Sequence, residues 1–224
     1  MFTNRQETVY SIQPGRGYAE ASEILGEGYC GVLVADGWAP YQKFEAATHQ
    51  TCLAHLLRRC GELLEQATGG AVRFPRAVKE TLQSALEVRD QRDAGTLSGE
   101  GLEKAKEELE LQMDRHLSGQ FTNPDNQRLA AHLIRHQDQL FVFLEREDVE
   151  ATNWPAEQGI RPAVINRKTS GGNRTAAGSQ AQAVLMSVLR TLQQHQLCVL
   201  EILPRLLRNP SLKLDAILPS PQPP

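Results

Sequence analysis

The 224-residue sequence contains no apolar run of the eighteen or so residues that a membrane-spanning helix needs. Its first eleven residues are polar and lack the apolar stretch of a secretion signal. The four cysteines are scattered, which is typical of free thiols and not of a disulfide scaffold. These absences argue against a membrane protein and a disulfide-rich secreted protein, so we expect a cytoplasmic location and no membrane partner.

A positive net charge is also lacking, since 24 basic residues face 27 acidic ones. A nucleic-acid-binding protein needs a local positive surface and not a positive total. Two stretches, 46–61 and 158–174, contain basic residues and no acidic residue. They favour local contact with nucleic acid, although ordinary solvated charge gives similar local excesses.

The sequence predicts strands and helices in its first fifty residues and mostly helices after them. Apolar patterning and Gly or Pro breaks predict strands at 7–13, 30–36 and 48–50, a helix at 17–25 and a helical turn at 38–44. Further helices are predicted at 51–67, 75–92, 98–117, 124–137, 140–146, from 153 onward, 180–197 and 199–208. Ser98 is the expected N-cap of the helix 98–117, whose residues Leu102, Ala105, Leu109, Met113 and His116 or Leu117 share one face. The buried side of the helix 180–197 is expected to carry Val184, Val188 or Leu189, and Leu192.

These elements suggest four regions. They are the strands and helix of an α/β core at 1–50, a helical region at 51–150, a segment with a short helix, a basic loop and closing helices at 151–208, and a proline-rich disordered tail at 209–224. So few strands look like an incomplete sheet, because an α/β core normally needs several strands to cover its helices.

The first chemical motif is an aspartate at the end of an apolar strand, Asp36, followed by Gly37. A carboxylate fixed there suits a divalent metal, because Mg²⁺ binds one or two protein carboxylates and shares its other positions with water and phosphate. A strand that ends in Asp-Gly is more often a simple turn. The motif alone therefore does not establish a metal site.

The second motif is Cys52-x-x-His55-x-x-Arg58-Arg59 on the predicted helix 51–67. His55 and Arg59 are four residues apart and share a helix face. A zinc site is discounted, because a second tight pair of ligands on a separate element is missing. An amphipathic helix with a basic side explains the motif equally well.

The third motif begins at Asn153 and places Glu157 four residues before Arg161, on a short helix that Pro162 is expected to end or bend. A glutamate in this position can bind a metal, and the basic residues after it can meet phosphates. The alternative is an exposed ion pair on a surface helix, followed by a cationic loop. The basic residues concerned are Arg161, Arg167, Lys168 and Arg174.

In this order the motifs resemble the transposases of the insertion sequence 66 family. Members show Asp-Gly-aromatic with a downstream Tyr, Cys-x-x-His-x-x-Arg, a helical insertion, Asn-Asn-x-x-Glu-x-x-x-Arg-Pro, a basic Arg-Lys pair, and Gly-Ser before a long closing helix. The resemblance covers roughly residues 8–207. The matching residues are Asp36-Gly37-Trp38 with Tyr41, Cys52 through His55 to Arg58, Asn153 through Glu157 to Arg161-Pro162, Arg167-Lys168 and Gly178-Ser179.

The resemblance implies an α/β fold, an incomplete ribonuclease-H-like catalytic core with a long helical insertion, mostly α by residue count. It also implies DNA transposition by a DDE-type site, where three carboxylates hold two Mg²⁺ (or Mn²⁺) ions that promote strand cleavage and joining. Asp36 matches the second acid and Glu157 the third, with Asn153 and Tyr41 in support. The expected DNA contacts are His55, Arg58, Arg59, Arg161, Arg167, Lys168 and Arg174.

The sequence departs from the family pattern at two places. The first acid should precede Asp36 by several tens of residues, whereas Glu7 lies only 29 residues upstream. Trp154-Pro155 also stands where the family has a second Asn and a small residue. We therefore expect a chain that begins inside the catalytic domain, without the family's N-terminal DNA-binding and zinc-binding regions, and that is inactive alone.

Two other functions remain open at this point. One is a non-catalytic DNA-binding or regulatory remnant that associates with a full-length transposase. The other is a helical interaction protein without a nucleic-acid role. For a transposase the expected partners are the DNA ends of its element and a second transposase chain, at a nucleoid-associated location.

Overall fold

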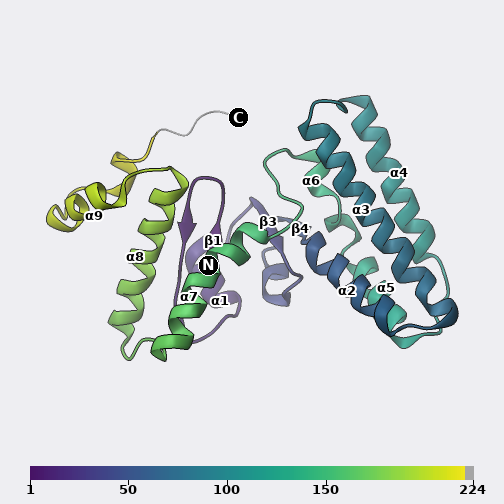
Figure 1. Ribbon diagram of the computed structural model, residues 1–224, viewed down its shortest axis with the longest axis horizontal. Coiled ribbons are helices and arrows are strands. Elements are labelled where there is room, and N and C mark those ends of the chain that lie inside the picture. Colours follow the sequence, from purple (N-terminus) through teal and green to yellow (C-terminus); the bar gives the residue numbers. More distant parts are fainter. Residues whose placement is uncertain (220–224) are drawn as a thin grey trace. The chain divides into compact units, whose positions relative to one another are not determined.

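The structure is a computed structural model that describes residues 1–219, and Figure 1 traces their path. Helices dominate and the strands are short, which confirms the expectation of a mostly α chain. The chain divides into two compact units, one of residues 21–153 and one of residues 1–20 and 154 onward. Helix α1 (Tyr18–Leu25) crosses the division between them. Of the predicted tail, residues 220–224 lie outside the described residues.

The unit of residues 21–153 begins with a pair of parallel strands, β3 (Val32–Ala35) and β4 (Thr48–Thr51). Val32 lies opposite Thr48 and Ala35 lies opposite Thr51. The short helix η1 (Ala39–Lys43) forms part of the connection between them. Parallel pairing brings the carboxyl ends of both strands to one edge of the sheet. Both strands and the helical turn were predicted from the sequence.

Helices make up the rest of this unit, and Figure 1 shows the two longest, α3 and α4, side by side. As predicted, Leu109, Met113 and Leu117 line one buried face of α4. Ser98 is not its N-cap, because Gly99 occupies that position with a positive φ of 51° and no side-chain cap. The elements are α2 (Leu53–Gln66), η2 (Gly69–Val72), α3 (Arg73–Asp93), α4 (Glu100–Leu117), α5 (Pro124–Arg135), η3 (Gln137–Gln139) and α6 (Val142–Glu145).

A single apolar core joins these helices, and one buried polar residue of β4 reaches into it. Gln50 is 1% exposed. Its amide nitrogen donates to the Leu140 carbonyl at 3.0 Å, and its oxygen accepts from the Phe143 N–H at 3.0 Å. Because a buried amide needs partners, these bonds fix the segment 140–143, which leads into α6, against the strand.

The second unit contains a short hairpin and three helices, and Figure 1 shows the hairpin beside α7 and α8. The strands β1 and β2 are antiparallel. Polar contacts fasten β2 to α8, since the Thr8 N–H donates to Thr191 Oγ1 at 3.1 Å and the Tyr10 N–H donates to Ser187 Oγ at 2.8 Å. The elements are β1 (Phe2–Thr3), β2 (Thr8–Val9), α7 (Trp154–Ser170), α8 (Ala176–Gln194), α9 (Val199–Arg208) and η4 (Leu214–Ala216).

Two expectations for this unit were wrong. The strand predicted at 7–13 extends only over Thr8–Val9, because the next backbone N–H, that of Tyr10, bonds a side chain of α8 and not a second strand. Val184 is 55% exposed, and the buried residues of α8 are Ala183, Thr191 and Leu192. Leu192 is thus buried as predicted, whereas near the start of the helix Ala183 is buried in place of Val184.

Across residues 1–219, no helix combines the length and the apolar character that crossing a bilayer would require.

Candidate active site

Asp36 directly follows β3, at the edge of the sheet where β3 and β4 both end. The residue is exposed, and its Oδ1 accepts the N–H of Trp38 at 3.1 Å. Gly37 between them has a φ of +86°, a conformation that favours glycine. The strand thus ends in a tight turn that holds the carboxylate at the solvent-exposed end of the sheet, as the sequence predicted.

Tyr41 lies in η1, shortly after this turn. Burial raises the pKa of its hydroxyl, and the negative charge of Asp36 raises this pKa further. The phenol therefore stays protonated at neutral pH and lies within electrostatic reach of the Asp36 carboxylate. Its supporting role remains a prediction.

The second motif forms the first half of α2. His55 and Arg59 are half-buried and Arg58 is exposed, so this helix presents at least one cation to solvent. Cys60, on the same helix, is 0% exposed, and burial raises the pKa of its thiol to about 11. In the part of the chain that the structure describes, no three His, Cys, Asp or Glu side chains are grouped closely enough to hold a metal ion.

Cys52 plays a structural part that the sequence analysis missed. It is 0% exposed, and its N–H donates to the carbonyl of Ala35 at 2.7 Å. Its sulfur accepts the N–H of Asn153 at 3.3 Å, and the next residue, Leu53, donates its N–H to the carbonyl of Ala151 at 2.9 Å. The segment 151–153, about a hundred residues away in sequence, is thereby held against the start of α2. The unusual position of a buried cysteine directly before a helix was the available signal.

A group of histidines next to Asp36 was also missed. His132 of α5 lies against Gly37, so that a Cβ atom added there would be 3.2 Å from its Cε1. The rings of His132 and His136 are 4.8 Å apart, and burial, with the positive charge of His136 and Arg59, lowers the pKa of His132 to about 4. Helix α5 thus contacts the turn after Asp36, a proximity that spacing along the chain does not reveal.

The third motif lies on α7, in the other unit. Glu157 is half-buried in the first turn, and Arg161 is exposed one turn later. The helix does not end at Pro162 but continues to Ser170. The missing N–H of a proline costs less on an exposed surface, since water can bond the carbonyl left without a donor.

Two of the basic residues predicted to lie in a loop belong to this helix. Arg167 and Lys168 form its last turn, where cations interact favourably with the negative end of the helix dipole. Arg174 follows the turn at 171–173 and precedes α8, which Thr175 caps by accepting the N–H of Gly178 at 3.0 Å. All four basic side chains of the motif are exposed.

The predicted site residues are therefore divided between the two units. Asp36, Tyr41, His55, Arg58 and Arg59 belong to residues 21–153, together with Asn153 at its end. Glu157 and the basic residues after it belong to the second unit. The side-chain oxygen of Asn153 is buried and has no hydrogen-bond partner among the described residues. The pairing of Asp36 with Glu157 stays a prediction.

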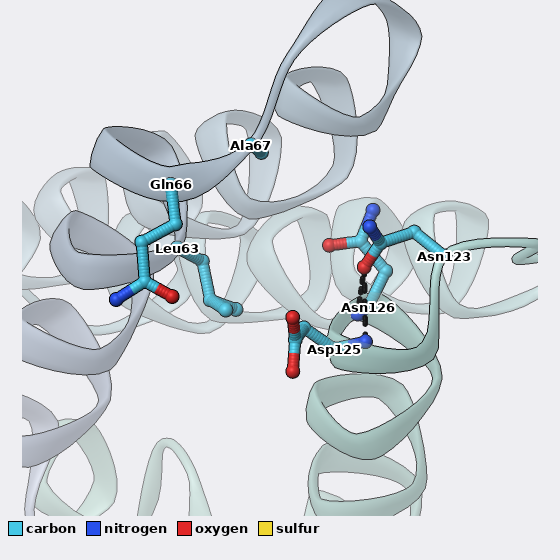
Figure 2. Close-up of a pocket in the computed structure, with 6 residues that line it drawn as sticks. All are labelled: Leu63, Gln66, Ala67, Asn123, Asp125 and Asn126. Atoms are coloured by element: carbon cyan, nitrogen blue, oxygen red, sulfur yellow. Dashed lines mark hydrogen bonds between the residues drawn. The ribbon is translucent and has the colours of Figure 1, made fainter.

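A shallow pocket lies elsewhere in the first unit, between the end of α2 and the start of α5 (Figure 2). Asn123 caps α5 there, since its Oδ1 accepts the N–H groups of Asp125 at 2.9 Å and Asn126 at 3.0 Å. The polar groups that Asn123 contributes to the pocket are therefore explained by their role in capping α5. None of the predicted site residues lines the pocket, which is formed by Leu63, Gln66, Ala67, Asn123, Asp125 and Asn126.

Comparison with known proteins gives one family and one partial relative. The family described as "Transposase IS66 family" matches residues 1–181. An "Uncharacterized protein y4jO" of Sinorhizobium fredii (strain NBRC 101917 / NGR234) is 33% identical over 67 residues, which is 30% of this chain and 21% of the relative. The matched part thus spans about a fifth of the length of that relative. No solved structure matches the chain.

Proposed function

The chain belongs to the IS66 family of transposases, and on that premise we propose that Asp36 and Glu157 are two of the three acids of a DDE-type site for DNA transposition. We propose further that β3 and β4 are strands of a ribonuclease-H-like sheet and that α2 to α6 contain its helical insertion. Parallel pairing of the two strands and the segment connecting them support this assignment.

The observation that carries the proposal is the position of Asp36. An exposed carboxylate at the carboxyl end of a parallel strand, held by the turn through Gly37, is open to solvent and to a polynucleotide. Carboxylate oxygen is the ligand type that Mg²⁺ prefers, so Asp36 and Glu157 fit such an ion. When bound, Mg²⁺ would activate water or a DNA 3′-hydroxyl for attack on a phosphodiester.

Glu157 lies on the same face of α7 as two of the exposed cations. Arg161 is four residues beyond Glu157 and Lys168 is seven beyond Arg161, and both spacings return to one side of a helix. A DNA backbone that follows this face could bring one phosphate to Arg161, through two parallel hydrogen bonds, and a second phosphate to Lys168. On α2, Arg58, Arg59 and His55 would offer phosphate contacts of the same kind.

The metal part of the proposal is tested with Mn²⁺, whose unpaired electrons broaden nearby NMR signals. We expect Mn²⁺ to broaden the backbone amides of Asp36 and Glu157 together, and Asp36→Asn to remove the effect at both. Glu103→Gln, an exposed change on α4, is the matched control and should leave the broadening intact. Broadening at only one of the two acids in the unchanged chain would contradict a shared site.

The DNA part is tested by fluorescence anisotropy with a labelled duplex at several salt concentrations. The double change Arg161→Gln and Lys168→Gln should reduce the slope of log affinity against log salt by about two, one for each lost phosphate contact. Arg76→Gln, an exposed change on α3, is the control and should leave the slope unchanged. Equal slopes in all three proteins would contradict the predicted DNA contacts.

We propose finally that these 224 residues do not transfer DNA strands by themselves, because two acids hold a pair of metal ions less well than three. A strand-transfer assay with Mg²⁺ and the DNA ends of the element tests this. Robust activity would contradict it. Salt-dependent DNA binding without Mn²⁺ binding would instead favour a non-catalytic DNA-binding protein.

A further inference from the structure

Cys52 links the strand that precedes Asp36 to the segment that precedes α7, the first through its backbone N–H and the second through its sulfur. Cys52 lies between β4 and α2 with 0% exposure. Its own N–H bonds the carbonyl of Ala35 at 2.7 Å, immediately before Asp36, and its sulfur accepts the N–H of Asn153 at 3.3 Å, immediately before α7 begins. One residue is therefore bonded to both chain segments that lead to the proposed acids.

A second bond reinforces this link. The N–H of Leu53 donates to the carbonyl of Ala151 at 2.9 Å, and both residues are 0% exposed. The side-chain oxygen of Asn153 has no partner among the described residues, so the side chain does not hold the segment through that atom. Within 151–153, the attachment to the start of α2 thus consists of the Ala151 carbonyl and the Asn153 N–H.

A thiol suits this position better than the side chains of alanine, valine or serine. Alanine or valine would leave the Asn153 N–H without its acceptor, and an unpaired buried donor is costly. Serine would accept the bond but would bring a hydroxyl proton that needs an acceptor of its own. A thiol accepts the bond, packs as a small apolar group, and loses little if its weak S–H donor is unpaired.

We propose that Cys52 is a positioning residue for the active site, one that fixes where α7 begins relative to Asp36. This inference rests on the proposed function. Glu157 is four residues beyond Asn153, so chain connectivity alone keeps their Cα atoms within about 14 Å. Anchoring Asn153 therefore limits the volume that the Glu157 carboxylate explores, and with it the chance that both acids contact one metal ion.

The bond itself is tested by hydrogen exchange of the Asn153 amide, measured by NMR on the full chain. In Cys52→Ala the exchange should be about tenfold faster, because one ordinary hydrogen bond is lost. Cys52→Ser should give an intermediate rate. Cys60→Ala is the matched control, because it removes an equally buried thiol from the same helix that has no bond to 151–153. An unchanged rate in Cys52→Ala, or an equal rise in Cys60→Ala, would overturn the proposal.

The positioning role is tested by the distance between spin labels at Glu62→Cys on α2 and Glu150→Cys, directly before the segment 151–153. Both sites are exposed, and the exposed Cys30 and Cys198 are first changed to serine. Adding Cys52→Ala should broaden the distance distribution about twofold, and Cys52→Ser should restore part of the original width. A distribution that stays as narrow as in the unchanged protein would overturn the proposal. If Cys52→Ala does not fold, Cys52→Val, which fills the volume without an acceptor, provides the same comparison.

Neither measurement uses metal or DNA, so the Cys52 proposal and the proposed function can be refuted independently of each other. A chain that passes both tests but binds neither Mn²⁺ nor duplex DNA would keep the Cys52 link and refute the proposed function. A chain that binds both ligands while Cys52→Ala changes neither measurement would keep the function and refute the positioning role.

Discussion

The imidazole of His132 lies against the backbone of Gly37, with its Cε1 atom 3.2 Å from the place where a Cβ atom would stand. The two residues are 95 positions apart in sequence, and Gly37 immediately follows the proposed catalytic Asp36. The contact means that α5 supports the turn that presents this carboxylate. A substitution at Gly37 should therefore change the free energy of unfolding.

Replacement of Gly37 by alanine should destabilise the protein by about 1–2 kcal/mol, because a side chain is strained at a φ of +86° and the new methyl group meets His132. Urea unfolding measures the change. Gly61→Ala on α2 is the matched control, since that site has open space and helical backbone, and it should stabilise by about 0.5–1 kcal/mol. A Gly37→Ala protein as stable as the unchanged chain would show that the turn does not need glycine.

Stability should fall as the pH falls from about 6.5 to about 4 through the contribution of His132. Burial and neighbouring positive charges lower its folded-state pKa to about 4, so the unfolded chain binds the proton more tightly. The stabilisation is therefore complete above pH 6.5 and is lost as the pH approaches 4, by about 1 kcal/mol, because solvent screens the charges around this half-buried ring. As the pH falls over this interval, the unchanged protein should lose unfolding free energy relative to His132→Gln, which lacks the titrating ring. An NMR titration of the His132 ring with a midpoint near 6.5 would refute the prediction.

Gln50→Leu should cost about 2–4 kcal/mol, although leucine is the more apolar residue. The change leaves the Leu140 carbonyl and the Phe143 N–H without their buried partners. Denaturant unfolding checks this, with Gln83→Leu on the exposed side of α3 as the control, expected within about 0.5 kcal/mol of the unchanged protein. Equal stability of the two variants would mean that solvent reaches the Gln50 site.

Two of the four thiols should react quickly with a disulfide reagent at pH 8 in the folded protein. Cys30 and Cys198 are exposed, whereas Cys52 and Cys60 are 0% exposed and burial raises the pKa of Cys60 to about 11. Addition of denaturant should expose Cys52 and Cys60 and allow their thiols to react. Rapid reaction of a third thiol without denaturant would contradict the buried position of Cys52 or Cys60.

Most helices could be predicted from the sequence, because helix formation follows from apolar spacing and end signals within about twenty residues. The predicted ranges for α2 to α5 and α9 lie within a few residues of the observed ones. The strand predicted at 7–13 was too long, because a tertiary contact between Tyr10 and α8 replaces strand pairing there. The helix α7 does not end at Pro162, which lies on its exposed surface.

The sequence by itself determined the family, through the order of its motifs, and placed Asp36 at the end of a strand because an apolar run followed by Asp-Gly is a local signal. Only the tertiary structure decided that Cys52 bonds Asn153, that His132 contacts Gly37, and that the Gln50 side chain accepts the N–H of Phe143. These contacts join residues about ninety to a hundred positions apart. Their formation depends on how the helices pack around a common core, and no periodicity along the chain encodes which distant atoms that packing will bring within hydrogen-bonding distance.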